Sequence, residues 1–366
     1  MGMGYQGFCR FYTTGPATGP QVVLATGAAV NLVLEPIYSA AVWGAGWYNA
    51  AETAHYADAA IRFEGTVDIE LQLGTGGAIW DLLGNWIVNT RAYPASLDIS
   101  PDGARVSQYR TTGAYGANYD NNGAWNTSAN FSTSEGSFVT CSLGVIALNR
   151  VAADPAGGTN YSSYSYINQK EGVIASNCAV LASTNPLNPS GNNVDPIPFW
   201  RTNAQLLYIG SYTAPFTGGT LPQTGTETIE WSTDVTQNHK VLYTCNGSRL
   251  PRALLQGAMG VTGNVVLYNV AGVFDPILGP AGTGTLTTPY LVAETTLFRV
   301  TINTQTTPVY IELPAVVVES DDYSIKGQSE VTNRSFGLKG LGGRCYSAVT
   351  LPPFLMSDSS GAFVAP

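Results

Sequence analysis

Charge is the property that this sequence has least of. Charged residues make up 11% of its 366 residues, against about 25% in an ordinary soluble domain. Lys and Arg total 16 and Asp and Glu total 25, which gives a formal net charge of −9. Because phosphate binding depends on Lys and Arg, this balance argues against a nucleic-acid-binding protein. We expect a surface covered by uncharged polar groups or by other protein.

Residues that carry catalysis or bind metals are also scarce. The two histidines, His55 and His239, lie neither in an HExxH pattern nor near a cysteine pair, so a zinc ligand set is missing. The sequence has no G-x-S-x-G nucleophile motif and no phosphate-binding loop ending in GK[ST]. Asp68 and Glu70 could act as an acid–base pair, but a flat strand offers no concave pocket. We therefore expect no enzyme, no cofactor and no metal.

The five cysteines are odd in number and widely spaced, which predicts free thiols in a reducing compartment. No apolar run approaches about 18 residues, the length that crosses a membrane, and the first residues lack the pattern of a signal peptide. We expect a cytosolic origin and no membrane partner.

β-structure dominates what is present, and residues 63–73, "FEGTVDIELQL", show it best. Apolar and polar residues alternate there with a period of two, which predicts a half-buried strand. The apolar set is Phe63, Val67, Ile69, Leu71 and Leu73. The polar set, on the other face, is Glu64, Thr66, Asp68, Glu70 and Gln72.

The chain divides near its middle. Residues 184–198, "TNPLNPSGNNVDPIP", carry four prolines and predict a linker, with its core at 186–198. The segments on either side match in pairs: 31–36 with 227–232, 64–73 with 261–270, and 140–150 with 333–343, where Ser142 and Gly144 meet Ser335 and Gly337. A duplicated fold is the economical interpretation, with chance similarity as the alternative.

Two local patterns complete the prediction. Ile79, Leu82, Leu83, Trp86 and Ile87 recur at helical spacing and predict one helix. Residues 109–137 are polar, rich in glycine and without a sustained period, so we expect a long loop or arm there that is ordered by a partner.

The order of these elements resembles the tail tube proteins of long-tailed bacteriophages. The resemblance is carried by "ETIEWSTDV", "RLPRALLQGAMGVTGNVVL", "TTLFRVTINTQTTPVYIELPAVVVES" and "SDDYSIKGQSEVTNRSFGLKGL". It covers most of 225–341 and, through the repeat, 31–149. It implies a mainly β fold of two tandem tube-like β-sandwich or β-barrel domains with few flanking helices, at 1–185 and 199–350. Inner sheets of neighbouring copies would join into a barrel around a channel, with three copies in each ring.

The resemblance also implies roles for particular residues. The chain would be a structural virion protein of the tail, assembled in the host cytoplasm from copies of itself and other tail proteins. Glu64, Thr66, Asp68, Glu70 and Gln72 would line the channel, where carboxylates let viral DNA pass without specific binding. The segment 109–137, with Tyr119, Trp125 and Phe131 as anchors, and the C-terminal segment 351–366 would be arms between stacked rings.

Other interpretations stay open from the sequence alone. The acidic face could be the ordinary solvated face of an antiparallel sheet. A decoration or fibre protein of a virion would also be rich in β-structure, acidic and without catalytic residues. The tube of a contractile injection system is a close relative of the tail tube, and a secreted carbohydrate-binding protein would use the many Tyr and Trp residues.

Overall fold

The computed structural model describes a mainly β chain built of antiparallel sheets. The described residues are 7–12, 21–23, 25–39, 55–73, 80, 83–84, 86–88, 104–110, 118–153, 195–208, 227–245, 247–255, 257–268, 296–305, 308–324, 333–342, 344–346 and 349–358.

The first half contributes long strands. They are β1 (Gly7–Tyr12), β2 (Gln21–Val23), β3 (Ala25–Ser39), β4 (His55–Glu70), β5 (Ala104–Arg110), β6 (Asn118–Ser134) and β7 (Thr140–Ala153).

The second half opens with the short 3-10 helix η4 (Phe199–Arg201) and continues in strands. They are β8 (Thr202–Tyr208), β9 (Glu227–Gln237), β10 (Lys240–Leu242), β11 (Ala253–Leu255), β12 (Met259–Tyr268), β13 (Thr296–Asn303), β14 (Pro308–Leu313), β15 (Val316–Ser324), β16 (Asn333–Gly340), β17 (Arg344–Tyr346), β18 (Val349–Leu351) and β19 (Leu355–Asp358).

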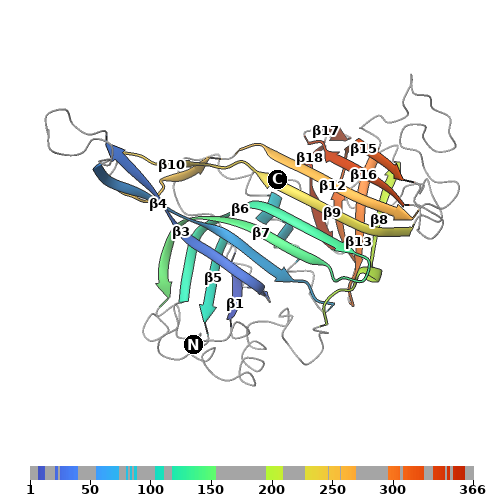
Figure 1. Ribbon diagram of the computed structural model, residues 1–366, viewed down its shortest axis with the longest axis horizontal. Helices are drawn as coiled ribbons and strands as arrows, with labels where there is room; N and C mark the ends of the chain where they lie inside the picture. The colour runs from blue at the N-terminus through green and yellow to red at the C-terminus, as the bar shows by residue number, and fades with distance from the viewer. Residues whose placement is uncertain are drawn as a thin grey trace.

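One large sheet runs through both halves. Its main path is β3–β4–β7–β6–β9–β12–β16–β15, and β5, β1 and β2 continue it from the first part of β6. The halves join where residues 128–134 of β6 pair with residues 230–236 of β9 (Figure 1). A second sheet, β19–β14–β13–β8, has four strands.

Alternation along the strands explains how the two sheets pack. Val67, Phe131, Trp231, Val265 and Phe336 are all buried on one face of the large sheet, although they lie on five different strands. They share one core cluster with buried side chains of the second sheet, among them Phe298, Val300, Ile311 and Leu313. Each such burial contributes about 1.5–3 kcal/mol to folding, so one core stabilises both halves together.

The predicted helix is confirmed where it is described. Trp80, Leu83 and residues 86–88 are helical and buried in the shared core, whereas Ile79 and Leu82 lie outside the described residues. Gln237 Nε2 of β9 donates to the Ile87 carbonyl at 2.5 Å. The helix of the first half is thereby bonded to a strand of the second.

The expected loop at 109–137 is wrong. Residues 118–134 form β6, the longest strand of the described residues, and it lies in the middle of the large sheet. Its buried positions include Asn126 and Thr133 as well as Ala124, Ala129 and Phe131, so even the core side of this strand is partly polar. Because small and polar residues occur on both faces of β6, the sequence shows no clear alternation of apolar and polar residues there.

The expected C-terminal arm at 351–366 is wrong for its first part. Residues 355–358 form β19, which pairs with β14 in the second sheet. Phe354 is fully buried and stacks on Phe131 with ring centroids 6.2 Å apart. This segment therefore belongs to the core, and residues 359–366 lie outside the described part.

The end of the expected linker also binds to the sheet. Ile197 is fully buried, its N–H donates to the Leu71 carbonyl, and its own carbonyl accepts from Val139. Pro196 and Pro198 form isolated bridges with Gln72 and Phe138. The domain boundary itself stays a prediction, because residues 186–194 lie outside the described residues.

The two halves of the large sheet share strand order and register. β3–β4–β7–β6 has the same order as β9–β12–β16–β15. Gly144 of β7 pairs with Thr66 and Ser128, and Gly337 of β16 pairs with Asn264 and Ser320.

Each of these glycines faces a register shift in the neighbouring strand. The shift falls between Asn126 and Ser128 in β6 and between Val318 and Ser320 in β15. A Cβ on Gly144 would collide with the hydroxyl of Ser128, and one on Gly337 with the hydroxyl of Ser320. The same glycine–serine contact therefore accompanies the same bulge in both halves.

Glycines in the large sheet allow a direct test of its packing. A Cβ on Gly65 would overlap the backbone of Ala29 and Val30 in β3, whereas a Cβ on Gly260 in β12 meets nothing within 4 Å. We expect Gly65→Ala to lower the free energy of unfolding by about 1–3 kcal/mol, because β3 must shift away. Gly260→Ala should leave it unchanged or raise it by about 0.5–1 kcal/mol. Urea unfolding followed by circular dichroism measures both; equal stability of the two variants would contradict the β3–β4 register.

Candidate functional site

The middle of the large sheet, on the face opposite the core, is polar across both halves. Residues paired in an antiparallel sheet point to the same face, so rows can be followed from strand to strand. One row runs through Asp68, Ser142, Asn130, Asp234, Thr262 and Lys339. It crosses β4, β7, β6, β9, β12 and β16 without an apolar residue.

The neighbouring rows have the same character. On one side lie Thr66, Gly144, Ser128, Thr236 and Gly260. On the other lie Glu70, Thr140, Ser132, Ser232, Asn264, Gly337 and Ser320. Among these, Thr66, Thr140, Thr236, Gly260 and Ser320 are exposed. We call these three rows the polar face.

Hydrogen bonds between strands hold the side chains of the polar face in place. Ser142 Oγ donates to Asp68 Oδ1 at 2.6 Å, and Asn130 Nδ2 donates to Asp234 Oδ1 at 2.5 Å. Ser132 and Thr140 share a hydroxyl contact of 2.9 Å. The carboxylates of Asp68 and Asp234 are thus held in place by donors on neighbouring strands.

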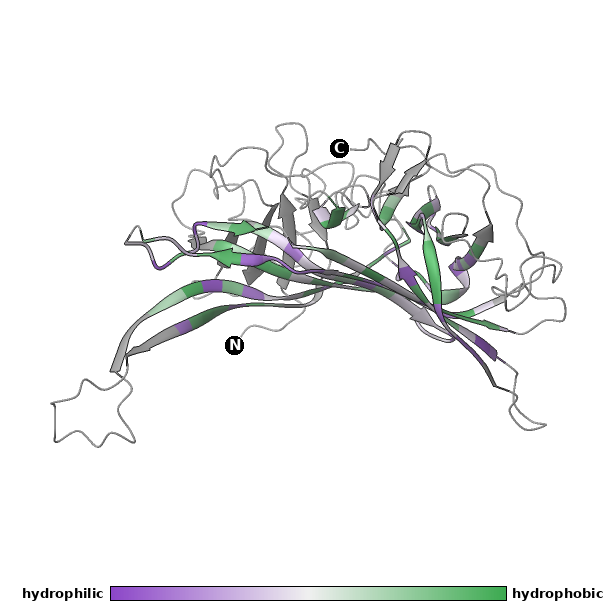
Figure 2. Cartoon of the chain, turned by 90° about the horizontal axis from the view of Figure 1, so that it is seen from above, coloured by the Kyte–Doolittle hydropathy of each residue, from purple (hydrophilic) through white to green (hydrophobic). Residues whose placement is uncertain are grey.

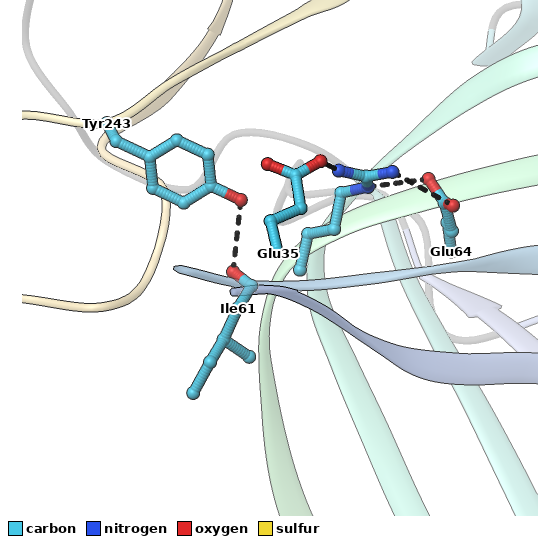
Figure 3. A network of polar contacts seen from close by, with 5 residues as sticks. Glu35, Ile61, Glu64 and Tyr243 are labelled. Carbon is cyan, nitrogen blue, oxygen red and sulfur yellow. Dashed lines mark hydrogen bonds and ion pairs between the residues drawn. The ribbon is translucent and has the colours of Figure 1, made fainter. Parts of the chain in front are cut away.

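Two positive charges on the polar side of the sheet, Arg62 and Lys339, are paired with carboxylates. Arg62, on the same side of β4, lies between Glu35 and Glu64, and its Nε donates to Glu64 at 2.8 Å (Figure 3). The hydrogen bonds that Arg62 donates to Glu64 raise the pKa of its guanidinium. At the far end Lys339 forms an exposed ion pair of 3.2 Å with Glu319. Such pairs add little stability. Within the three rows of the polar face, three acidic residues (Asp68, Glu70 and Asp234) stand against one cation, Lys339.

The curvature of the sheet places this face on a hollow side. Figure 2 shows the large sheet as an arch, with the four-stranded sheet on its convex side. Because the buried core lies between the two sheets, the polar face is the concave one.

An arm from the second half covers one end of this concave side. We call the connection between β9 and β12, with β10 and β11, the docking arm. Its Leu254 packs with Trp125 and Ile146 in a small separate cluster. The Ile61 N–H donates to the Arg249 carbonyl, and Arg249 Nε donates to the Ala59 carbonyl at 2.8 Å. The arm thereby bonds the free edge of β4.

The predicted channel residues divide into three groups. Glu64, Thr66 and Asp68 lie on the polar side of β4, with Thr66 exposed and the others half-buried. Glu70 occupies a position in the third row, but its side chain is not among the described ones. The prediction that Gln72 lines the channel is wrong, because β4 ends at Glu70 and Gln72 is buried where it bridges to Pro196.

Two of the three residues predicted to contact neighbouring rings are buried within the chain. Phe131 is fully buried in the main core, and Trp125 is buried beneath the docking arm. The side chain of Tyr119 is not among those described. The sequence-based prediction did not include Asn130 and Asp234. The alternation in "WSTDVTQ" would have placed Asp234 on the face of the strand that does not carry Trp231 and Val235.

Within the described residues, no group of three or more His, Cys, Asp or Glu residues could hold a metal. Cys141 is a buried free thiol whose pKa is raised by burial, and Cys245 is an exposed free thiol. No helix in the described ranges is long and apolar enough to cross a membrane.

Acid should loosen the docking arm through His239. Its ring packs edge-on against Trp125 with centroids 5.2 Å apart, and its Nε2 contacts the Asn126 carbonyl at 2.9 Å. Burial lowers the pKa of His239 below its usual 6.5, so the neutral form is favoured in the folded chain. This contribution to stability is present above pH 6.5 and is lost as the pH falls from there through the lowered pKa. After correction for the intrinsic pH dependence of amide exchange, protection of the arm should therefore fall below pH 6.5, and His239→Gln should remove that fall; an equal fall of protection in the variant would contradict it.

Comparison with known proteins gives little beyond this geometry. No family model matches the chain, and no curated protein matches it. Among solved structures, the chain is similar to one titled "Hybrid structure of the SPP1 tail tube by solid-state NMR and cryo EM", with 16% identity. The match covers 43% of this chain and 77% of that chain, and its TM-score of 0.24 is too low to support an argument about function.

Proposed function

We propose that this chain is a structural subunit of a bacteriophage tail tube, and that its polar face lines a channel through which DNA passes. The observation that carries the proposal is the uninterrupted polar face on the concave side of one sheet that spans both halves. The order of elements in the sequence, which resembles tail tube proteins, supports the same assignment. No catalytic role is proposed.

The chemistry of the polar face suits the passage of DNA. A channel rich in Lys or Arg would hold phosphates by releasing their counterions, and DNA would move slowly. Asp68 and Asp234 repel phosphates instead, and the surrounding Ser, Thr and Asn residues keep the wall hydrated. Arg62 and Lys339 are each paired with a carboxylate, so they offer little to a passing phosphate.

The matching halves support a duplicated tube unit. Strand order, the glycine–serine contact and the bulge recur in both halves of the large sheet. Three copies would then supply six units to each ring, and stacked rings would form the tube in the virion after assembly in the host cytoplasm. The partners are further copies of the chain and other tail proteins.

Assembly is the first test of the proposal. Free edges of the large sheet need pairing, so we expect the purified chain to form rings or hollow tubes that are visible by negative-stain microscopy. The control is the same preparation at a concentration too low for assembly. A compact trimer that never polymerises would favour a decoration or fibre protein instead, and a stable monomer at high concentration would refute self-assembly.

Charge on the polar face should control the rate of DNA release. Thr66 and Thr262 are exposed on this face, so Thr66→Lys with Thr262→Lys adds two positive charges per chain without removing a buried contact. We expect particles with this double variant to assemble but to release DNA several-fold more slowly at low salt, with recovery as ionic strength rises.

The matched control places the same charges elsewhere. Asn203 on β8 and Asn303 on β13 are exposed on the second sheet. Asn203→Lys with Asn303→Lys should leave the rate of DNA release unchanged, as measured by fluorescence of a DNA-binding dye after triggered release. Equal rates for both double variants would place the polar face outside the channel.

A further inference from the structure

We infer that β15 of one copy pairs antiparallel with β3 of a second copy, in the register that β6 and β9 use inside each chain. This inference rests on the proposed self-assembly and specifies its interface. The junction between the two halves of the sheet would then be repeated between chains.

Both strands lie at the ends of the large sheet in the described part of the chain. Among the described strands, β3 pairs only with β4, and β15 pairs only with β16. Leu32 and Leu34 of β3 point to the same side as the buried Val30, yet they are 50% and 49% exposed. Apolar side chains exposed beside an unpaired strand edge indicate a surface that another strand covers.

The internal junction shows which residues would meet. Gly65 in β4 and Gly263 in β12 occupy equivalent positions in the two halves. Gly65 pairs with Val30 of β3, and Gly263 pairs with Thr233 of β9. One residue further along, Asn31 of β3 is therefore equivalent to Asp234 of β9.

The other side of the junction follows from the shared bulge. Ser128 of β6 and Ser320 of β15 lie opposite Gly144 and Gly337. Two residues further along, Asp322 of β15 is equivalent to Asn130 of β6. The sequences agree here, since "SANFS" at 128–132 matches "SDDYS" at 320–324 in both serines and in the aromatic residue.

Transferring the register gives a specific pair. Inside the chain Asn130 pairs with Asp234, and the amide donates to the carboxylate at 2.5 Å. Between chains the equivalent pair is Asp322 with Asn31, and both side chains are exposed in the single copy. The amide and the carboxylate have exchanged strands, so the same hydrogen bond forms in the opposite direction.

The remaining positions in this register are also compatible. Ser128 pairs with Thr236 inside the chain, which places Ser320 opposite Val33 between chains. Phe131 pairs with Thr233, which places Tyr323 opposite Val30. Pairing two different edges is a head-to-tail contact, which builds a ring when the rotation closes.

Engineered disulfides test the register directly. Opposite residues of an antiparallel pair have Cα atoms about 4.5–5.5 Å apart, within reach of a disulfide. Under oxidation, Asn31→Cys with Asp322→Cys should give covalent multimers on non-reducing gels. Asn31→Cys with Ser320→Cys, two residues out of register, should not. Each single variant controls for the native cysteines, including the exposed Cys245.

Exchange of charge provides a second test. Asn31→Asp should place two carboxylates opposite each other and raise the concentration needed for assembly by about fivefold per junction. Asn31→Asp with Asp322→Asn recreates the internal Asn130–Asp234 arrangement and should restore assembly. Asn203→Asp, at an exposed position of β8, should leave the concentration needed for assembly unchanged.

The outcomes separate the two proposals. Tubes that form normally while neither cysteine pair crosslinks, or while both crosslink equally, would overturn this junction and leave the tube function standing. A double exchange that assembles no better than Asn31→Asp would also overturn it. A wild-type chain that never associates would overturn both.

Discussion

The backbone pairing of β6 with β9 is the contact on which the rest of the structure depends. Residues 128–134 and 230–236 join two sets of four strands into one sheet, so the core continues from Val67 to Phe336 without interruption. Without this pairing each half would expose a long strand edge and the core residues beside it. The same pairing brings the helix close enough to bond with Gln237 and the docking arm close enough to bond with β4.

The two-residue period of the strands gives the two faces of the sheet different chemistry. One face of the sheet satisfies the core, which leaves the other face free to carry Ser, Thr, Asn and Asp in rows. Because the sheet arches toward this polar side, the three rows lie on its concave face. Low overall charge is consistent with such a molecule, since uncharged hydroxyl and amide groups make up most of the polar face.

Much of the core architecture was predictable from local pattern. The alternation in residues 63–73 predicted a strand and its buried side, although β4 ends at Glu70, and the helical spacing predicted that Leu83, Trp86 and Ile87 are buried. Matching Gly144 with Gly337 in the sequence also anticipated the common register of the two halves. The matched segments 31–36 and 227–232 share an order but not a register, because the pairing aligns Asn31 with Asp234.

Local sequence alone determined which segments alternate and which side of each strand is apolar, since these depend on neighbours one or two residues away. Only the tertiary structure decided what lies beside them. Asn130 and Asp234 are 104 residues apart, yet their hydrogen bond crosses the junction. Gln72 continues a polar alternation but is buried, because the segment ending at Pro198 folds over the end of β4. β6 has a weak apolar pattern and becomes a strand through pairing on both sides, a non-local gain that no window of sequence contains.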